Sequence, residues 1–392
     1  MPVRKLIFWT HLTAGVVVGL VILLMSVTGV LLTYEKQMLA WADSGYRVAP
    51  QATRLGMETL LERALRPGRP LPERVIVYSD PSKPVALFYG RGPTVYVNPY
   101  TAGIAGEGST AVRGFFQTVT SWHRRFGADG PGRATARAIT DACNFAFLFI
   151  LVSGLYLWIP RRWTRNSLAA VSLFRGGLAG KARDFNWHNV TGIWCVIPLI
   201  LIVASGVVMS YPWASDLVYR AAGSNPPTRR AENGKAGNRK ADNRKTHDVV
   251  STAGWNDAWA RAEAQTPDWR IITLRVPASG RAPLTFVIDR GTGLQPQTRG
   301  TLVIERTPGA AARWEGFGGR DAGQKLRTWF RFVHTGEYYG VIGQTVAGLA
   351  SAGAALLVWT GLALAFRRFR QWRARSRTKA QEEEVVLVGA GK

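Results

Sequence analysis

Four long runs of apolar residues constrain this chain more than any other feature of its sequence. They cover residues 6–33, 138–159, 187–211 and 341–366, and Asp141 in the second run is the one acidic residue among them. A helix of roughly 20 apolar residues crosses the hydrocarbon core of a bilayer. We therefore predict an α-helical membrane protein with four transmembrane helices in contact with membrane lipid.

Basic residues beside these runs predict which side of the membrane each loop occupies. In a soluble protein the net charge of +25 would suggest nucleic acid as a partner, but here the charge gathers next to the apolar runs. Arg4 and Lys5 precede the first run, six basic residues lie in residues 161–186, and seven lie in residues 367–379. Short loops rich in Lys and Arg stay in the cytoplasm. We expect both termini and the 161–186 loop to be cytoplasmic, and no nucleic acid partner.

This topology divides the chain into alternating membrane and water-exposed segments. The basic start of the first run is also typical of a secretory signal, but a signal has only about 7–15 apolar residues, so we expect a retained anchor. The predicted segments are helix 1 (1–34), an outer unit (35–137), helix 2 (138–160), a cytoplasmic basic loop (161–186), helix 3 (187–211), a second outer unit (212–340), helix 4 (341–366) and a cytoplasmic tail (367–392).

The first and third runs share a pattern that repeats at a fixed offset of 177 residues. The matching pairs are His11 and His188, Gly15 and Gly192, Gly29 and Gly206, and Tyr34 and Tyr211. Residues 152–162 and 359–368 repeat more loosely, and a segment with one histidine precedes each of them. Since each half enters and leaves on the same side, we predict two parallel repeats related by a pseudo-twofold axis along the membrane normal.

Each outer unit has the pattern of a helix followed by short strands. The predicted helices are residues 57–65 and 254–264, and the predicted strands are residues 73–79, 85–90, 94–99, 269–276 and 284–289. Alternating apolar residues bounded by Gly or Asp turns predict antiparallel sheets, so we expect two α+β units. Residues 222–247 are basic and almost without apolar residues, which predicts a flexible linker.

Four of the five histidines form two layers, while His247 lies in the predicted linker. His11 and His188 stand at the cytoplasmic starts of helices 1 and 3, and His123 and His334 lie in interfacial helices just outside helices 2 and 4. A six-coordinate haem takes two imidazole ligands from opposite sides. We predict two haem b groups, one in each layer, because no CxxCH motif for covalent attachment is present.

Other interpretations of these residues stay open. One haem alone, or structural or proton-relaying histidines, would also place imidazoles at helix ends, whereas a zinc site lacks acidic or cysteine partners. Gly15 and Gly192 lie one turn from their histidines and leave room either for a flat macrocycle or for close helix packing. Arg124 and Arg331 are candidates to pair with haem propionates, or they are simply solvated at the interface.

Three motifs are similar to those of a known family. FWTHLTAG (8–15), WHNVTG (187–192) and HTGEYYGVIGQ (334–344) resemble segments of the PepSY-associated transmembrane helix proteins, and the resemblance covers nearly the whole chain. The best understood members are inner-membrane siderophore reductases of the ferrioxamine type. The resemblance implies two periplasmic PepSY-like domains, and it places His11, His123, His188 and His334 at the haem-ligand positions of the family.

The same resemblance implies a ferric-siderophore reductase that passes electrons across the bacterial inner membrane to the periplasm. No GxGxxG motif follows a strand, so we expect the electron donor to be a separate quinol or cytoplasmic reductase. Two alternatives remain. One is a non-redox PepSY membrane protein that binds or regulates a periplasmic peptidase or other partner, and the other is a siderophore transporter, which requires a polar cavity at mid-membrane.

Overall fold

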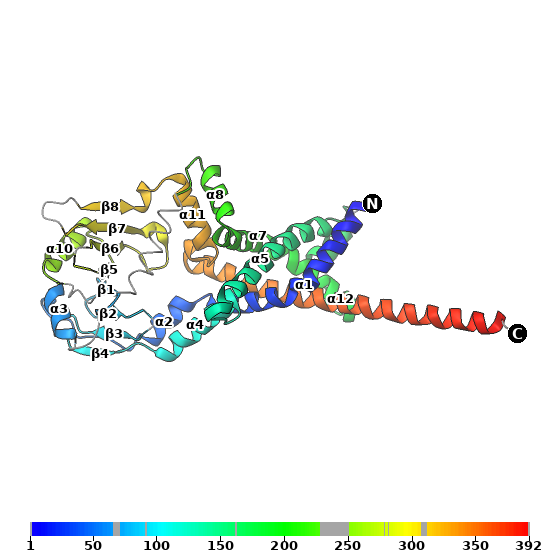
Figure 1. Cartoon of the computed structure of the whole chain (residues 1–392), viewed down its shortest axis with the longest axis horizontal. Coiled ribbons are helices and arrows are strands. Elements are labelled where there is room, and N and C mark those ends of the chain that lie inside the picture. Colours follow the sequence, from blue (N-terminus) through cyan, green and yellow to red (C-terminus); the bar gives the residue numbers. More distant parts are fainter. Residues whose placement is uncertain are drawn as a thin grey trace.

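The structure, a computed structural model, is elongated and has a sheet unit at one end and a helical bundle next to it (Figure 1). It describes residues 2–65, 71–90, 92–160, 163–227, 251–277, 279–280, 282–306 and 312–390, and side chains as far as residue 378. Most of the predicted linker, residues 228–247, and with it His247, lies outside the described residues.

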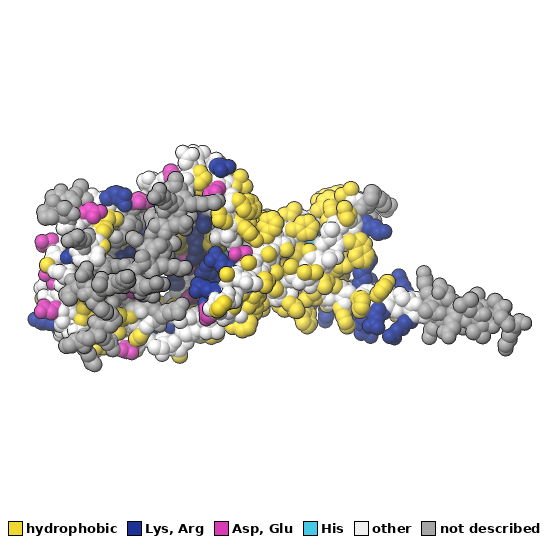
Figure 2. All heavy atoms as spheres, viewed as in Figure 1, with side chains coloured by type: hydrophobic (Ala, Val, Ile, Leu, Met, Phe, Trp, Pro, Cys, Tyr) yellow, Lys and Arg dark blue, Asp and Glu magenta, His cyan; other side chains and the backbone are white. Residues whose placement is uncertain are grey.

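In the described part of the chain, four helices are long and apolar enough to cross a membrane, in agreement with the four predicted spans. They are α1 (Pro2–Leu32), α5 (Arg133–Trp158), α7 (Gly180–Ser210) and α12 (Gly340–Ala390). Each packs on two neighbours around the bundle, in the order α1, α12, α7, α5, so α1 and α7 occupy opposite corners. Hydrophobic side chains cover the outside of this bundle, and Lys and Arg side chains gather where it ends beside the C-terminal helix (Figure 2).

The middle of the bundle is a packed apolar core. Ile22, Phe147, Leu151, Leu199, Val203, Ala350 and Ala354 are all less than 9% exposed and come from all four helices. Burial of this kind stabilises the bundle interior through dispersion contacts between closely packed side chains. This core separates the two ends of the bundle from each other.

The sheet unit contains one eight-stranded antiparallel sheet with the order β4-β3-β2-β1-β5-β6-β7-β8. Its strands are β1 (Arg74–Tyr78), β2 (Val85–Phe88), β3 (Thr94–Val97), β4 (Ile104–Glu107), β5 (Ile271–Arg275), β6 (Leu284–Asp289), β7 (Arg299–Ile304) and β8 (Arg313–Gly316). Strands β1–β4 come from the segment between α1 and α5, and β5–β8 come from the segment between α7 and α12. The two segments join where β1 pairs with β5, with Ile76 opposite Thr273.

The predicted helices and strands are present, but the two outer units share a single sheet, which the sequence pattern did not indicate. In the first half β1 has only β2 as a neighbour, so its other edge would expose unpaired backbone groups. Pairing with β5 satisfies that edge. Helices α3 (Met57–Ala64) and α10 (Trp255–Gln265) cover the apolar face of both halves, and their side chains form one core with strand residues such as Phe286.

Shorter helices connect the sheet unit to the bundle. They are α2 (Glu35–Ala42), α4 (Thr110–Arg125), α8 (Pro212–Ala221) and α11 (Ala322–Val333), with the 3₁₀ turns η1 (Gly130–Gly132), η2 (Pro296–Thr298), η3 (Phe317–Gly319) and η4 (Glu337–Tyr339). Helix α6 (Arg165–Ser172) lies at the other end, in the loop between α5 and α7. Helix α4 packs on α1 and α5, and α11 packs on α7 and α8.

The shared sheet predicts that the two halves of the sheet unit unfold together. Phe286 is fully buried beneath Trp259, and Phe286→Ala should lower the free energy of unfolding by about 3–5 kcal/mol, the usual cost of removing a core aromatic side chain. Limited proteolysis in detergent with increasing urea should then show cleavage on both sides of the β1–β5 junction at one lower urea concentration. Ile104→Ala on exposed β4 is the control and should change little. Release of the second half alone would contradict a cooperative sheet.

Candidate functional site

The four layered histidines lie at the two ends of the bundle, as the sequence predicts. His11 on α1 and His188 on α7 lie at the end remote from the sheet, and we call them the distal pair. His123 near the end of α4 and His334 directly after α11 lie at the end facing the sheet, and we call them the proximal pair. Along α1, 17 residues separate His11 from Thr28, the contact of His123, which is roughly 25 Å of helix.

The proximal imidazoles lie close together. The ring centroids of His123 and His334 are 6.4 Å apart, with an interplanar angle of 66°. Two metal–nitrogen bonds of about 2 Å, added to the distance from each nitrogen to its ring centre, place the centroids of two axial imidazoles roughly 6 Å apart. Burial is the main cause that lowers the pKa of both side chains to about 4, so both are neutral at neutral pH. A neutral imidazole is the form that binds a metal.

Each of the four imidazoles contacts a hydroxyl group on a neighbouring helix through Nδ1. The separations are 2.9 Å from His11 to Ser153, 2.9 Å from His123 to Thr28, 3.0 Å from His188 to Thr360 and 3.0 Å from His334 to Ser205. Histidines of the distal pair thus bond to α5 and α12, and those of the proximal pair bond to α1 and α7. The same contact occurs in both halves of the chain.

These contacts determine which ring nitrogen has the proton. Each hydroxyl donates its own hydrogen to a carbonyl of its helix, as Thr28 does to Leu24 at 2.7 Å and Ser205 does to Ile202 at 2.6 Å. The corresponding bonds of Ser153 and Thr360 run to Ile150 and Leu356. A hydroxyl has one hydrogen, so its oxygen must accept from the imidazole Nδ1–H. Nε2 then keeps its lone pair, which is the atom a metal requires.

For His334 a second contact supports the same tautomer. Its Nδ1 also lies 2.9 Å from the carbonyl oxygen of Ile202, and a carbonyl can only accept. The carbonyls of Met25, Ile150 and Leu357 are likewise hydrogen-bond partners of His123, His11 and His188. His334 therefore donates through Nδ1 toward the residue three positions before its hydroxyl partner, and Met25, Ile150 and Leu357 occupy the corresponding position for the other three histidines.

Small residues leave space beside the distal pair. A Cβ added to Gly15 would meet nothing within 4 Å, and one added to Gly192 would meet only Leu357 at 3.7 Å. Thr191, three residues after His188, has a buried hydroxyl oxygen without a hydrogen-bond partner in the described part of the chain. Space and an unsatisfied polar atom next to a ligating type of side chain fit a bound group at this layer.

Arginines surround the proximal pair, while acidic residues pair with only some of them. Burial and the charges of Arg137 and Arg331, together with Arg125 and Arg133, lower the pKa of Arg124. Arg125 bonds to Asp129 at 3.1 Å and Arg137 lies 3.5 Å from Asp141. For Arg124 and Arg331, the described residues show no ion pair, so their positive charge is available to an anion. Lys and Arg side chains gather between the bundle and the sheet unit (Figure 2).

This set of residues fits haem better than an ion held by protein alone. Each layer has two imidazoles, and in the described residues no group of three or more His, Cys, Asp or Glu side chains could hold a metal ion. Zinc takes four ligands, so each layer would be two short. A porphyrin supplies four nitrogens to its iron and leaves two axial positions for imidazoles. The proximal centroid separation and the free Nε2 atoms match that need.

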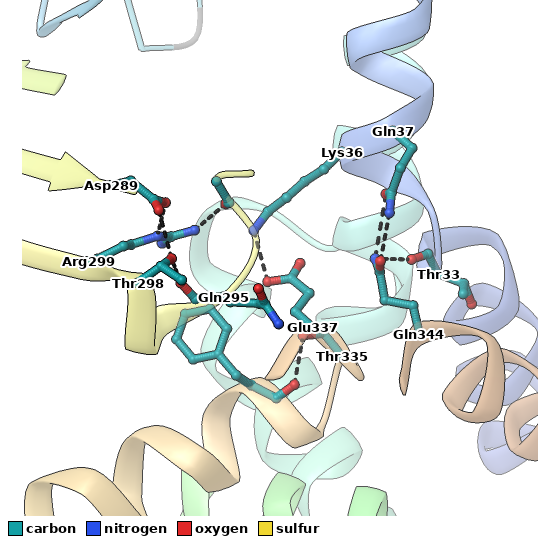
Figure 3. A network of polar contacts seen from close by, with 12 residues as sticks. Thr33, Lys36, Gln37, Asp289, Gln295, Thr298, Arg299, Thr335, Glu337 and Gln344 are labelled. Carbon is teal, nitrogen blue, oxygen red and sulfur yellow. Dashed lines mark hydrogen bonds and ion pairs between the residues drawn. The ribbon is translucent and has the colours of Figure 1, made fainter. Parts of the chain in front are cut away.

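A polar network, which the sequence did not indicate, holds the loop after His334. Lys36 forms an ion pair with Glu337 at 2.8 Å, and Gln37 donates to Gln344 at 2.6 Å. Gln344 also donates to the carbonyl of Thr33, so the end of α1 and the start of α2 bind both η4 and α12 (Figure 3). The network connects the proximal histidine of the second half with the first half of the chain.

A second buried cluster fixes helix α4, which contains His123. Arg113 of α4 forms an ion pair with Asp43 at the end of α2, and Tyr96 of β3 donates to the same carboxylate at 2.8 Å. The backbone N–H of Ser109 donates to Asp43 at 2.9 Å. Burial would raise the pKa of Asp43, but these hydrogen bonds outweigh it and hold the pKa below its usual value. Asp43 therefore joins α2, the sheet and helix α4.

Fold and site together define an integral membrane protein of four helices with an attached antiparallel sheet and with two layers of paired histidines. The chain belongs to the PepSY-associated TM family, because residues 8–368 match the PepSY-associated TM region. No curated protein matches the sequence.

The Asp43 cluster predicts a pH-dependent stability. Because the folded pKa of Asp43 is below its unfolded value of about 3.9, its contribution is complete at pH values above the unfolded pKa and is lost as the pH falls through the folded pKa. Asp43→Asn should lower the free energy of unfolding at pH 7 by about 3 kcal/mol, since Arg113 loses its buried partner. Urea unfolding between pH 7 and pH 3 measures this difference, which should shrink below about pH 4.

Asp268→Asn is the matched control for this measurement. Asp268 is 3.8 Å from Arg290 and both side chains are more than half exposed, so the loss should be under about 1 kcal/mol at any pH. An equal loss from Asp43→Asn at pH 3 and pH 7 would show that packing, not charge, sets the contribution of Asp43.

Proposed function

We propose that this protein is a di-haem b oxidoreductase that moves electrons across the bacterial inner membrane to reduce a ferric siderophore. The observation that supports this most strongly is the arrangement of the four imidazoles. They form two pairs, roughly 25 Å apart along α1; each has its Nδ1 engaged, and the described residues show no hydrogen bond to its Nε2. One pair near each end of a four-helix bundle is the ligand set that two axially ligated haems require.

The proposal includes the orientation predicted from the basic loops. Both termini are cytoplasmic, the sheet unit is periplasmic, and the two halves are parallel repeats about an axis along the membrane normal. The hydroxyl contacts support the repeat, because Thr28 and Ser205, the partners of His123 and His334, are separated by the same 177 residues as His11 and His188. Two PepSY-like halves that share one sheet fit the same symmetry.

In this function the residues of the chain would hold and orient the two haems and would exclude water from the space between them. Haem iron, when bound, supplies the one-electron chemistry. His11 and His188 would ligate one haem, His123 and His334 the other, and Gly15 and Gly192 would leave room for the distal macrocycle. The apolar core around Ile22 and Leu199 keeps water out of the space between the pairs. The donor is a quinol or a cytoplasmic reductase, because the chain has no nucleotide-binding fingerprint of its own.

The positive surface beside the proximal pair supports an anionic substrate. Arg124 is exposed and lies among other arginines, and Arg331, also exposed, lies in the same group. Such a concentration of charge attracts anions such as a carboxylate-based ferric chelate, or haem propionates. Hard oxygen chelators hold ferrous iron less tightly than ferric iron, so reduction at this surface would release the metal.

Two other functions remain to be tested against this one. A non-redox PepSY protein that binds or regulates a periplasmic peptidase would use the sheet unit and would need no haem. A siderophore transporter requires a polar path through the bundle. The packed core of Ile22, Phe147 and Leu199 leaves no such path among the described residues, which disfavours transport.

Haem content tests the proposal directly. The purified protein in detergent, expressed with adequate haem supply, should contain two b haems per chain by pyridine haemochrome. His11→Ala and His188→Ala should each lose the distal haem, and His123→Ala and His334→Ala the proximal one. His247→Ala is the control, since His247 belongs to neither layer, and it should keep both. Retention of two haems in all four histidine variants would contradict the ligand assignment. Absence of haem from the wild-type protein would favour the non-redox PepSY protein that binds a periplasmic partner.

The rate of reduction of a ferric chelate tests whether a ferric siderophore is the substrate. With the protein reduced chemically, ferric siderophore should yield ferrous iron, trapped by a ferrous-specific dye, faster than with haem-free protein. Arg124→Gln with Arg331→Gln should raise KM for an anionic chelate about tenfold and leave a neutral chelate unaffected, because two charge-assisted contacts are lost. Salt should reduce the difference. The control Arg290→Gln, whose charge is not among those that act on Arg124, should behave like the wild type.

A further inference from the structure

Each hydroxyl partner of a histidine is followed directly by glycine. The four dipeptides are Thr28-Gly29, Ser153-Gly154, Ser205-Gly206 and Thr360-Gly361. Serine and threonine within helices often bond back to their own carbonyls, so that feature alone is ordinary. A second bond from each such hydroxyl to an imidazole on another helix, followed by glycine in all four cases, is a feature that neither helix packing nor hydropathy requires.

The glycines allow the rings to lie directly against the partner helix. A Cβ on Gly154 would come within 3.1 Å of Cε1 of His11, and one on Gly361 within 3.3 Å of Cε1 of His188. For Gly29 the corresponding distance to His123 is 3.7 Å, an ordinary contact. The two distal rings therefore lie closer to the glycine backbone than the proximal rings do. Gly206 differs, because a Cβ there would meet Asn144 at 2.8 Å instead of His334.

We propose that these four hydroxyls, with Gly154 and Gly361 beside the distal rings, are positioning residues that fix the tautomer, rotation and donor strength of the histidines, and so set the reduction potential of each haem separately. This inference rests on the proposed function. The hydroxyl accepts from Nδ1–H, and an acceptor at that position raises the basicity of the ligating nitrogen. Because the hydroxyl proton is already bonded to a carbonyl, its oxygen is polarised and accepts more strongly.

The effect of losing a hydroxyl on the reduction potential follows from the difference in charge between ferric and ferrous iron. A more basic imidazole stabilises ferric iron relative to ferrous iron, because the ferric ion has the greater positive charge. Removing the hydrogen-bond acceptor weakens this preference, so the ferrous form becomes relatively more stable and the reduction potential rises. The effect should be confined to one layer, since Thr28 and Ser205 contact only the proximal histidines and Ser153 and Thr360 only the distal ones.

Redox potentiometry of the full-length protein in detergent tests this inference. Thr28→Val, Ser205→Ala, Ser153→Ala and Thr360→Val should each keep two haems. Each should shift the oxidised-to-reduced equilibrium of one haem by about 3- to 10-fold toward the ferrous form, roughly 30–60 mV for one electron. The first two should act on the proximal haem and the last two on the distal haem. Low-temperature EPR of the same samples reports the rotation of the axial rings.

Two variants separate positioning from packing. Thr28→Ser keeps the acceptor but removes a methyl group, so the potential should stay near the wild-type value. Thr140→Val removes a buried hydroxyl of α5 whose bond runs to Ala136 of its own helix, and it should leave both potentials unchanged. Gly154→Ala should change the EPR signature of the distal haem alone, because the added methyl displaces His11.

The outcomes distinguish failure of this inference from failure of the proposed function. Absence of haem from the wild-type protein would overturn both. Two haems with unchanged potentials and EPR signals in all four hydroxyl variants would overturn this inference and leave the proposed function intact. Equal effects of Thr28→Ser and Thr28→Val would also overturn it, since the methyl group would then be the cause. A layer-specific rise that Thr28→Ser does not show would support it.

Discussion

The hydrogen bond between each imidazole and a hydroxyl on a neighbouring helix is the interaction on which the rest of this structure depends. A buried N–H without a partner costs free energy, more so where water is absent. His123 satisfies its Nδ1 at Thr28, and His11 satisfies its Nδ1 at Ser153. The register of the helices and the orientation of the imidazoles are therefore coupled. Any arrangement of the bundle that gives each Nδ1–H its acceptor also fixes the direction in which the Nε2 of that ring points.

Helices α1 and α7 take part in this constraint twice. Helix α1 contains His11 of the distal pair and Thr28, which holds the proximal pair, and α7 contains His188 and Ser205 in the same relation. Because one residue corresponds to about 100° of helix rotation, a shift of either helix by one position would break contacts at both ends. The apolar core lies between the two histidine pairs, while α1 and α7 each contact both pairs, so a displacement of either helix would affect both.

Hydropathy and spacing predicted the spans and the two histidine layers, because both are properties of sequence along single helices. The hydroxyl partners could not be predicted in the same way. Many Ser and Thr residues lie in these helices, and only packing decides which of them faces a ring. A signal was nevertheless present for one pair, since Thr28 and Ser205 repeat at the offset of the histidines. The single sheet escaped prediction because strand alternation does not specify which neighbour an edge strand takes.

The shared sheet explains how two distant segments bring His123 and His334 within 6.4 Å of each other. Helix α4 follows β4 and α11 leads from β8, and these strands form opposite edges of the sheet. Seven strand spacings separate those edges by roughly 34 Å. With 16 and 12 residues, α4 and α11 extend about 24 Å and 18 Å, enough together to cover that width from both sides. Two independent outer domains would leave the spacing of the histidines free, whereas the β1–β5 junction fixes the edges from which α4 and α11 start.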